Sequence, residues 1–308
     1  MINQDKTNPL HGAISIWCVH TPRPARGRVQ CGSIPHRSLW PITIQGDGRT
    51  DARRGHHKTS NVYMSQNKFG LCSGGRDSIV ATHKMMQEAE NDRKNPVIVY
   101  LDTTIGIEEN HEYVQNLCDE FGWQLWTLRT QESFERMVEK YGFPGPSKHT
   151  IAYAYLKERQ LSKLASVAED PHFYTGIRAN ESQRRMGNAK RKQEKLGAVW
   201  HSEIIDWSLG RVKDYIKDHD LPENPLWDKG HFKDCGCGAF GSPEELIELQ
   251  ADYPEMYDKI KELEESLDRD DERTKWGWDA LSETELRKIR AENDDMQMTL
   301  CSTCGVEK

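Results

Sequence analysis

The chain has 308 residues, which is enough for one large domain or two small ones with a substantial hydrophobic core. Charged residues make up 30% of it, its mean hydropathy is -0.82 and no apolar run approaches membrane-spanning length, so we expect a soluble, cytoplasmic protein without a secretory signal that crosses no membrane. The net charge of -7 argues against a general nucleic-acid binder, although it leaves room for a local basic patch.

Residues 1–63 differ in composition from the rest of the chain. They are rich in arginine, histidine, proline, glycine and threonine, and the first glutamate of the chain is Glu88. A disordered basic arm and an organellar transit peptide are two explanations, but the prolines and glycines disfavour the amphipathic helix of the second. We favour a third, in which the biological start is Met64 and residues 1–63 are a poorly ordered or non-native extension.

The stretch FGLCSGGRDSIV combines a short apolar strand, two glycines and the start of a helix near Asp77. Glycines let the backbone turn tightly, so that successive amide N–H groups converge beside a helix N-terminus, where their partial positive charge suits an anion such as phosphate. The competing explanation is an ordinary strand-to-helix turn capped by Asp77 or Ser78. The candidate anion-binding residues are Ser73, Gly74, Gly75, Arg76, Asp77 and Ser78.

Two more strands are predicted in the next part of the chain. Residues 95–104 form a buried-strand pattern that ends in an aspartate and two threonines, a helix covers 108–122, and WQLWTLRT is the following strand. This alternation predicts an α/β fold, a parallel sheet wound with helices, which binds ligands at the carboxyl ends of its strands. Asp102 and Thr103 would lie at such an end, while a helix cap or turn residue is the equally weighted explanation for Asp102.

A cluster of arginines follows the next predicted strand, residues 173–177. Arg178, Arg184 and Arg185 would leave the sheet at the same edge as the glycine loop. Guanidinium groups offer planar paired donors to phosphate or sulfate oxygens, which lysine cannot copy. The basic residues 190–192 are instead expected to be solvated.

Several motifs in this order resemble one known family. Ser-Gly-Gly-x-Asp-Ser at 73–78 is similar, letter for letter, to the PP-loop of the ATP-pyrophosphatases, and YLDTT resembles their relatives' VDTG, with Thr104 in place of glycine. TGIRANES, DWS and LPENPL are similar to further motifs of the same group. The chain is therefore identified as resembling the PAPS reductase-like family of the PP-loop ATP-pyrophosphatase (adenine nucleotide alpha hydrolase-like) superfamily, over about residues 68–267.

The resemblance implies a Rossmann-like fold and an adenine nucleotide, which would be PAPS, APS or ATP. Residues 64–232 would form the nucleotide-binding domain, with the phosphates on the glycine loop. The family's Thr-Gly-x-Arg stretch implies contacts from Gly176 and Arg178, and Arg185 would lie nearby.

The C-terminal region, residues 233–308, carries two close pairs of cysteines. Cys235-x-Cys237 and Cys301-x-x-Cys304 flank a helix predicted over about 243–267 that opens with a Ser-x-x-Glu capping box. Two such pairs can bring four thiolates to one centre, and both Zn²⁺ and a 4Fe-4S cluster accept such a set. Redox-active dithiols are the alternative. Cys72 and Cys118 fall on predicted core elements and are expected to be packing residues.

The resemblance implies a reductase whose catalytic residues are Cys304, Arg178 and Asp77. Its thiolate would displace AMP, or the 3'-phosphorylated form, from sulfite, and a thioredoxin-like protein would be the reductant. Sulfonucleotide reductases usually carry this thiol in a Glu-Cys-Gly-Leu-His tail, and APS reductases have an adjacent Cys-Cys pair ahead of Thr-Gly-x-Arg. This chain departs from both patterns, because its tail has Cys304-Gly305 and its Cys-x-Cys comes later.

Two other functions stay open on the sequence. In an ATP-dependent sulfurtransferase, ATP and Mg²⁺ would adenylate a nucleic-acid acceptor, tRNA or the DNA backbone, and a sulfur donor would replace the activated oxygen. In a non-catalytic scaffold, the cysteines would form a zinc knuckle. A homodimer is an option for each of them.

Overall fold

The computed structural model describes residues 67–92, 96–130, 132–146, 149–179, 190–229 and 235–278, together with the backbone of 14–19 and 40–44. Its strands are β1 (Ile14–Val19), β2 (Trp40–Ile44), β3 (Lys68–Leu71), β4 (Val97–Asp102), β5 (Leu125–Arg129), β6 (His172–Tyr174), β7 (Lys192–Lys195) and β8 (Ala198–His201). They form one sheet in the order β2-β1-β5-β4-β3-β6-β8-β7.

The centre of this sheet is parallel. Strands β5, β4, β3, β6 and β8 pair with their neighbours in parallel, whereas β7 pairs with β8 and β1 pairs with β5 in antiparallel fashion. The predicted sheet wound with helices is thus confirmed as a mixed sheet dominated by parallel strands. Parallel strands buried on both faces read as continuous apolar runs, which is why VIVYLD and LWTLR could be recognised from the sequence.

The antiparallel β1–β2 ribbon extends the sheet beyond β5 and lies in residues 1–63, where the sequence pattern predicted no strand. The segment ISIWCV is rich in β-branched and aromatic residues, which favour strands. Pairing with β5 also satisfies the backbone groups that an edge strand leaves open. The domain boundaries at 63/64 and 232/233 stay predictions.

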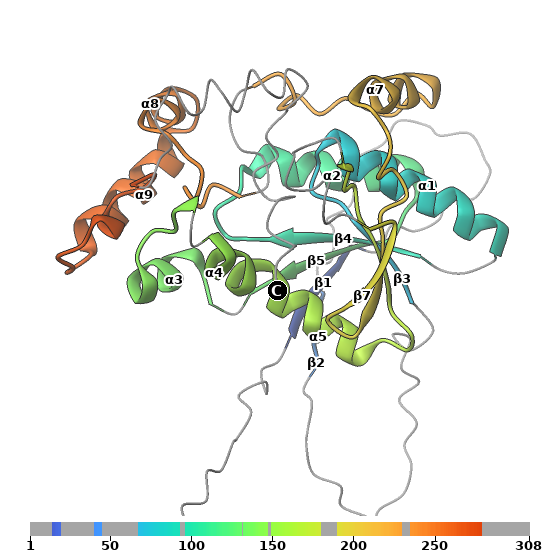
Figure 1. Ribbon diagram of the computed structural model, residues 1–308, viewed down its shortest axis with the longest axis horizontal. Helices are drawn as coiled ribbons and strands as arrows, with labels where there is room; N and C mark the ends of the chain where they lie inside the picture. Colours follow the sequence, from blue (N-terminus) through green and yellow to red (C-terminus); the bar gives the residue numbers. More distant parts are fainter. Residues whose placement is uncertain are drawn as a thin grey trace, which may run out of the picture.

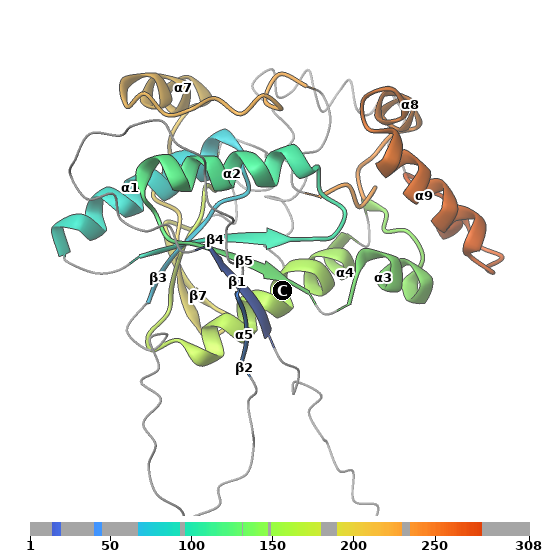
Figure 2. The same ribbon diagram turned by 180° about the vertical axis from the view of Figure 1, so that it is seen from behind.

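Helices cover both faces of the sheet. Figures 1 and 2 show α1, α2 and α7 on one face and the run from α4 through η3 to α5 on the other. The bounds of the helices are α1 Arg76–Asp92, α2 Glu108–Phe121, α3 Phe134–Tyr141, α4 His149–Tyr153, η3 Ala154–Glu158, α5 Arg159–Val167, α7 Leu209–Asp218, α8 Pro243–Asp252, α9 Pro254–Ser266 and the short η5 Glu272–Thr274. No helix in these described parts of the chain has the length and apolar character needed to cross a bilayer.

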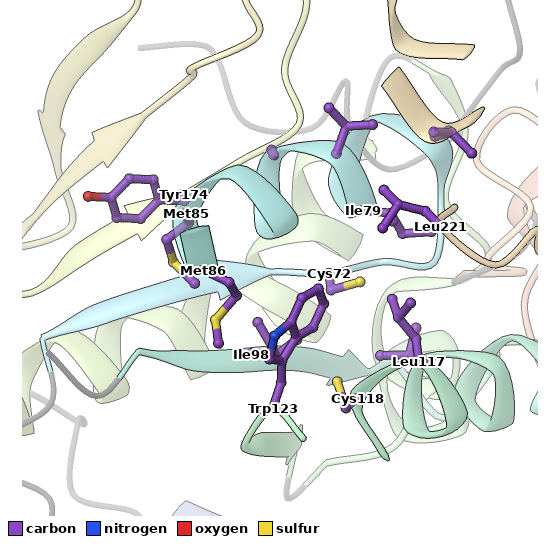
Figure 3. Close-up of a cluster of buried hydrophobic side chains, with 14 of the residues drawn as sticks. Cys72, Ile79, Met85, Met86, Ile98, Leu117, Cys118, Trp123, Tyr174 and Leu221 are labelled. Carbon is purple, nitrogen blue, oxygen red and sulfur yellow. The ribbon is translucent and has the colours of Figure 1, made fainter. Parts of the chain in front are cut away.

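Cys72 and Cys118 are packing residues, as predicted. Figure 3 shows both thiols among the apolar side chains under α1 and α2, where they are 2% and 1% exposed. Burial raises the pKa of the Cys72 thiol to about 11 and that of the Cys118 thiol well above its usual value, because a thiolate is poorly solvated there. Neither thiol is therefore a nucleophile at neutral pH.

The predicted C-terminal helix is two helices. The capping box at Ser242 and Glu245 is present, but α8 ends at Asp252 and α9 begins at Pro254. A proline lacks the N–H of the helical ladder and its ring clashes with the preceding turn, so the single helix predicted here was wrong. Figures 1 and 2 show both helices beyond the end toward which the β4 arrow points.

The described part of the C-terminal region shares a hydrophobic core with an earlier part of the chain. Its buried side chains pack with those of α3, α4 and η3, and the members from both parts are Ile105, Phe134, Met137, Val138, Phe143, Ala152, Tyr155, Leu156, Cys235, Cys237, Ala239, Leu249, Ile260, Leu263 and Trp276. Residues 235–278 are therefore packed on the sheet domain at the edge where β4 ends.

Candidate functional site

The strand order creates a switch point between β3 and β6. From β3 the chain proceeds to β4 and β5 on one side, and β6 then pairs with the other side of β3. In open parallel sheets, ligands bind outside the carboxyl ends of the strands where the order reverses in this way. The glycine loop follows β3 and the Thr-Gly-x-Arg stretch follows β6, so the structure brings these two predicted segments together.

The glycine loop, residues 73–78, is closed by its own hydroxyl groups. Ser78 Oγ accepts from Ser73 N at 3.1 Å, lies 3.2 Å from Ser73 Oγ and donates to Gly75 O at 2.9 Å. Gly74 has φ +80°, and a Cβ there would lie 2.1 Å from Asn110 Oδ1. Glycine is required here for both its left-handed backbone and the close approach of that side chain.

Gly176 brings the two segments into direct backbone contact. A Cβ at Gly176 would lie 2.4 Å from the carbonyl carbon of Asp77 and 2.5 Å from Ser78 N. The segment was predicted to be the end of a strand over 173–177, but β6 ends at Tyr174. Thr175 N still donates to His201 O at the end of β8 at 2.9 Å, and the next residue, Gly176, lies against the first turn of α1.

Arg178 lies against Asp77, the aspartate of the glycine loop. The distance from Arg178 Nε to Asp77 Oδ1 is 2.9 Å, and the side chains are 5% and 15% exposed. These two atoms do not align as a directed hydrogen bond, so charge attraction is the main contribution. Arg185, predicted beside Arg178, lies outside the described residues.

Asp102 and Thr103 lie at the same edge, at the end of β4. The Asp102 carboxylate accepts from Thr104 N at 2.8 Å and pairs with Arg129 Nε at 2.7 Å, which are the contacts of a turn residue. Thr103 is buried. Their contact with a nucleotide stays a prediction.

Thr104 has φ +63°, a backbone region that favours glycine. Three hydrogen bonds hold it there. Besides the bond from its N–H to Asp102, its Oγ1 accepts from Phe134 N at 2.8 Å and its carbonyl accepts from Lys259 Nζ at 2.9 Å. The end of β4 is thereby tied to both α3 and α9.

Sequence reasoning missed three residues whose side chains donate hydrogen bonds to the carbonyl groups of the glycine loop. Asn110 Nδ2 donates to Ser73 O at 2.9 Å, while Asn224 Nδ2 and Trp227 Nε1 donate to Gly74 O at 3.0 and 2.9 Å. One signal was available, because Asn110 shares a helix face with Val114 and Leu117 and is a polar residue on that apolar stripe.

The Cys235-x-Cys237 segment also lies at this edge. The thiols are 3% and 8% exposed, Gly236 N donates to Ile105 O at 2.6 Å, and Trp276 Nε1 donates to Gly236 O at 2.9 Å. Cys301 and Cys304 lie outside the described residues, and within those residues no three potential ligands meet in a metal-binding group.

Comparison with known proteins gives a consistent set of relatives. The model of the phosphoadenosine phosphosulfate reductase domain matches residues 67–243. The adenosine 5'-phosphosulfate reductase of Staphylococcus haemolyticus is 27% identical over 169 residues, covering 54% of this chain and 67% of that protein. Adenosine 5'-phosphosulfate reductase 1 of Bacillus subtilis is 24% identical over 194 residues, covering 61% and 76%.

Among solved structures, the phosphate complex of the phosphoadenylyl-sulfate (PAPS) reductase of Candida auris matches with a TM-score of 0.40 and 18% identity, covering 57% of this chain and 82% of that one.

Proposed function

Because the chain belongs to the phosphoadenosine phosphosulfate reductase domain family, we propose that it binds PAPS or APS at the β3–β6 switch point and reduces the sulfur group to sulfite. The observation that carries this proposal is the meeting of the glycine loop and Arg178 across the switch point, 2.9 Å apart at Asp77. Two segments a hundred residues apart in sequence thus offer an anion two kinds of donor at one place.

In this proposal the phosphate next to the ribose lies on the glycine loop, at the backbone amides that follow Ser73. The first amides of a helix have no intrahelical acceptor, and their partial positive charge favours an anion. Arg178 would contact the sulfate or a distal phosphate, with Arg185 adding charge, and Gly176 would let Arg178 come this close. Asp77 would hold the guanidinium in place. Asp102 and Thr103 would line the neighbouring strand end.

The reaction needs a thiolate, which we assign to Cys304. Its sulfur would form a bond to the sulfur of the sulfo group while the bond from that sulfur to the phosphate oxygen breaks, and AMP or its 3'-phosphorylated form would leave with that oxygen. One thiol of a dithiol protein of the thioredoxin class would then attack the Cys304 sulfur and displace sulfite, which leaves a mixed disulfide. Its second thiol would attack the first, form the internal disulfide and release Cys304 as a thiol. Arg178 would stabilise the negative charge that develops on the departing phosphate.

The buried thiols of Cys235 and Cys237 fit a metal centre that Cys301 would join, while Cys304 serves as the nucleophile of the proposed reductase. In the ATP-dependent alternative, Cys304 would be the fourth ligand. Cys235 and Cys237 flank Gly236, whose backbone N–H donates to Ile105 O and whose carbonyl accepts from Trp276 Nε1. A Zn²⁺ ion would supply structural cross-linking, and a 4Fe-4S cluster would add its charge beside the site.

Replacing Cys237 by serine is expected to remove the metal from anaerobically purified protein, because an alcohol is a far poorer ligand than a thiolate. Iron, zinc and visible absorbance are measured in parallel. The matched control is Cys118→Ser, a buried cysteine of the apolar core, which should keep full metal content. Equal metal content in wild type and Cys237→Ser would exclude this centre.

Anaerobic incubation with PAPS, APS and ATP in turn, with thioredoxin present, is expected to yield sulfite from one of the first two and no pyrophosphate from ATP. Sulfite and pyrophosphate are read in parallel. Pyrophosphate without sulfite would favour the ATP-dependent sulfurtransferase with Mg²⁺. If neither product forms, the non-catalytic zinc-knuckle scaffold is the remaining function. Cys304→Ser should abolish sulfite and retain metal if Cys304 is the nucleophile, whereas loss of metal would make it a ligand.

A further inference from the structure

We infer that Asn110, Asn224 and Trp227 are positioning residues for the anion-binding amides of the glycine loop. The inference rests on the proposed function and names the side chains that orient the amides of the phosphate site. None of the three would touch the nucleotide. They act through the carbonyl groups of Ser73 and Gly74.

The two asparagines form one directed chain of hydrogen bonds. Leu226 N donates to Asn224 Oδ1 at 2.9 Å, Asn224 Nδ2 donates to Asn110 Oδ1 at 2.9 Å, and Asn110 Nδ2 donates to Ser73 O at 2.9 Å. Flipping either amide would set like atoms against each other, so both orientations are determined by their partners. Because the asparagines are 0% and 2% exposed, water cannot replace a lost bond at little cost.

Three successive loop carbonyls are therefore bound on the protein side. Ser73 O accepts from Asn110, Gly74 O accepts from Asn224 and Trp227, and Gly75 O accepts from Ser78 Oγ and Ile79 N.

The direction of these carbonyls determines the direction of the next amides. The described backbone has no cis peptide bond, and in a trans peptide unit the N–H points opposite to the C=O. The N–H groups of Gly74, Gly75 and Arg76 are thus directed away from the anchoring side chains. The change from φ +80° at Gly74 to the right-handed helix after it curls successive N–H groups into a concavity that suits an anion.

Trp227 has a second contact with the loop. The Arg76 guanidinium lies 4.6 Å from the centre of its ring, and Arg76 Nη2 lies 3.1 Å from Asp228 Oδ1. One indole therefore holds the Gly74 carbonyl with its N–H and supports Arg76 with its face. The LWD turn after β8 and α7 in the chain thus orders both ends of the Gly74–Arg76 segment.

The experiment compares Trp227→Phe and Asn224→Ala with wild type in titrations of the full chain with adenosine, AMP and APS. Trp227→Phe keeps a ring and removes one N–H, so the Kd of AMP and APS should rise about three- to tenfold while that of adenosine stays unchanged. Asn224→Ala removes two donated bonds and should raise these constants by about tenfold or more. Thermal unfolding is measured on the same samples.

The matched control is Trp200→Phe. Trp200 is 6% exposed and donates Nε1 to Lys195 O at 2.8 Å, so Trp200→Phe loses the same kind of bond as a change of Trp227, which is 5% exposed, but the acceptor lies at the end of β7 and not in the glycine loop. It should lower the Tm by a similar amount and leave the AMP-to-adenosine ratio of dissociation constants unchanged.

If wild type shows no affinity for AMP or APS, the proposed function and this inference both fail. If wild type binds them and both variants keep its AMP-to-adenosine ratio, the inference alone is overturned. A variant that weakens the binding of adenosine as much as the binding of AMP also counts against the inference, because a merely structural role would affect both ligands equally. Either variant alone decides the question if the other does not fold.

Discussion

Replacing Gly176 by alanine is expected to destabilise the protein by about 2–4 kcal/mol and to weaken APS binding at least about tenfold. The new methyl group would lie 2.4 Å from the Asp77 carbonyl carbon, 2.5 Å from Ser78 N and 2.6 Å from Asp77 O. All three are backbone atoms of the first turn of α1, so no side chain can rotate away. The loop and Arg178 would have to move apart.

Denaturant unfolding and calorimetric titration with APS measure the two effects. The control is Gly210→Ala, where the new Cβ would meet nothing closer than Ser208 Oγ at 3.7 Å. Gly210 is the second residue of α7, and alanine is the better helix former, so this variant should be neutral or stabilised by up to about 1 kcal/mol. Wild-type unfolding and affinity in Gly176→Ala would contradict the close contact.

Replacing Arg178 by glutamine is expected to reduce kcat/KM for sulfite formation by at least about a hundredfold, because in the proposed function its guanidinium would stabilise the developing phosphate charge. It should also cost about 3–5 kcal/mol of unfolding free energy, since the mostly buried Asp77 carboxylate would lose the guanidinium beside it. Arg178→Lys should recover part of the stability and little of the activity, because an ammonium lacks the planar paired donors.

The double variant Asp77→Asn/Arg178→Gln separates the two roles of the pair. Removing both charges should restore most of the stability and none of the activity. Arg191→Gln is the control, because Arg191 pairs with Asp206 at 3.0 Å while both side chains are more than half exposed, and its loss should cost less than about 1 kcal/mol. Recovery of sulfite formation in the double variant would show that Arg178 has a structural role alone.

Much of the site could be predicted because its parts are local in sequence. The apolar runs of β4 and β5, the paired glycines after β3 and the arginine after β6 each specify their own conformation within a few residues. Since parallel strands end at one edge, their order along the chain was enough to expect the glycine loop and Arg178 on the same side. That expectation agrees with the 2.9 Å contact to Asp77.

Other features of the fold depend on contacts with residues that are distant in sequence, which no local sequence pattern can predict. The break at Pro254 had a visible signal, but the ribbon β1–β2 is defined by its pairing with β5, more than a hundred residues later. Thr104 keeps a glycine-like backbone through bonds to Phe134 and Lys259, which lie on different helices. The shared core of α3, α4, α8 and α9 likewise joins segments that are separate in sequence.

The sequence by itself indicated the central strands and helices and the family, and it predicts a phosphate site at the glycine loop, because backbone preference, periodicity and short motifs act over neighbouring residues. The tertiary structure alone decided which side chains form hydrogen bonds to the carbonyl groups of that loop. Asn224 and Gly74 are 150 residues apart, and their 3.0 Å hydrogen bond exists only when the segment after α7 packs against α1 and α2. Buried polar groups must find partners wherever the packed chain places them, and that placement is a property of the whole fold.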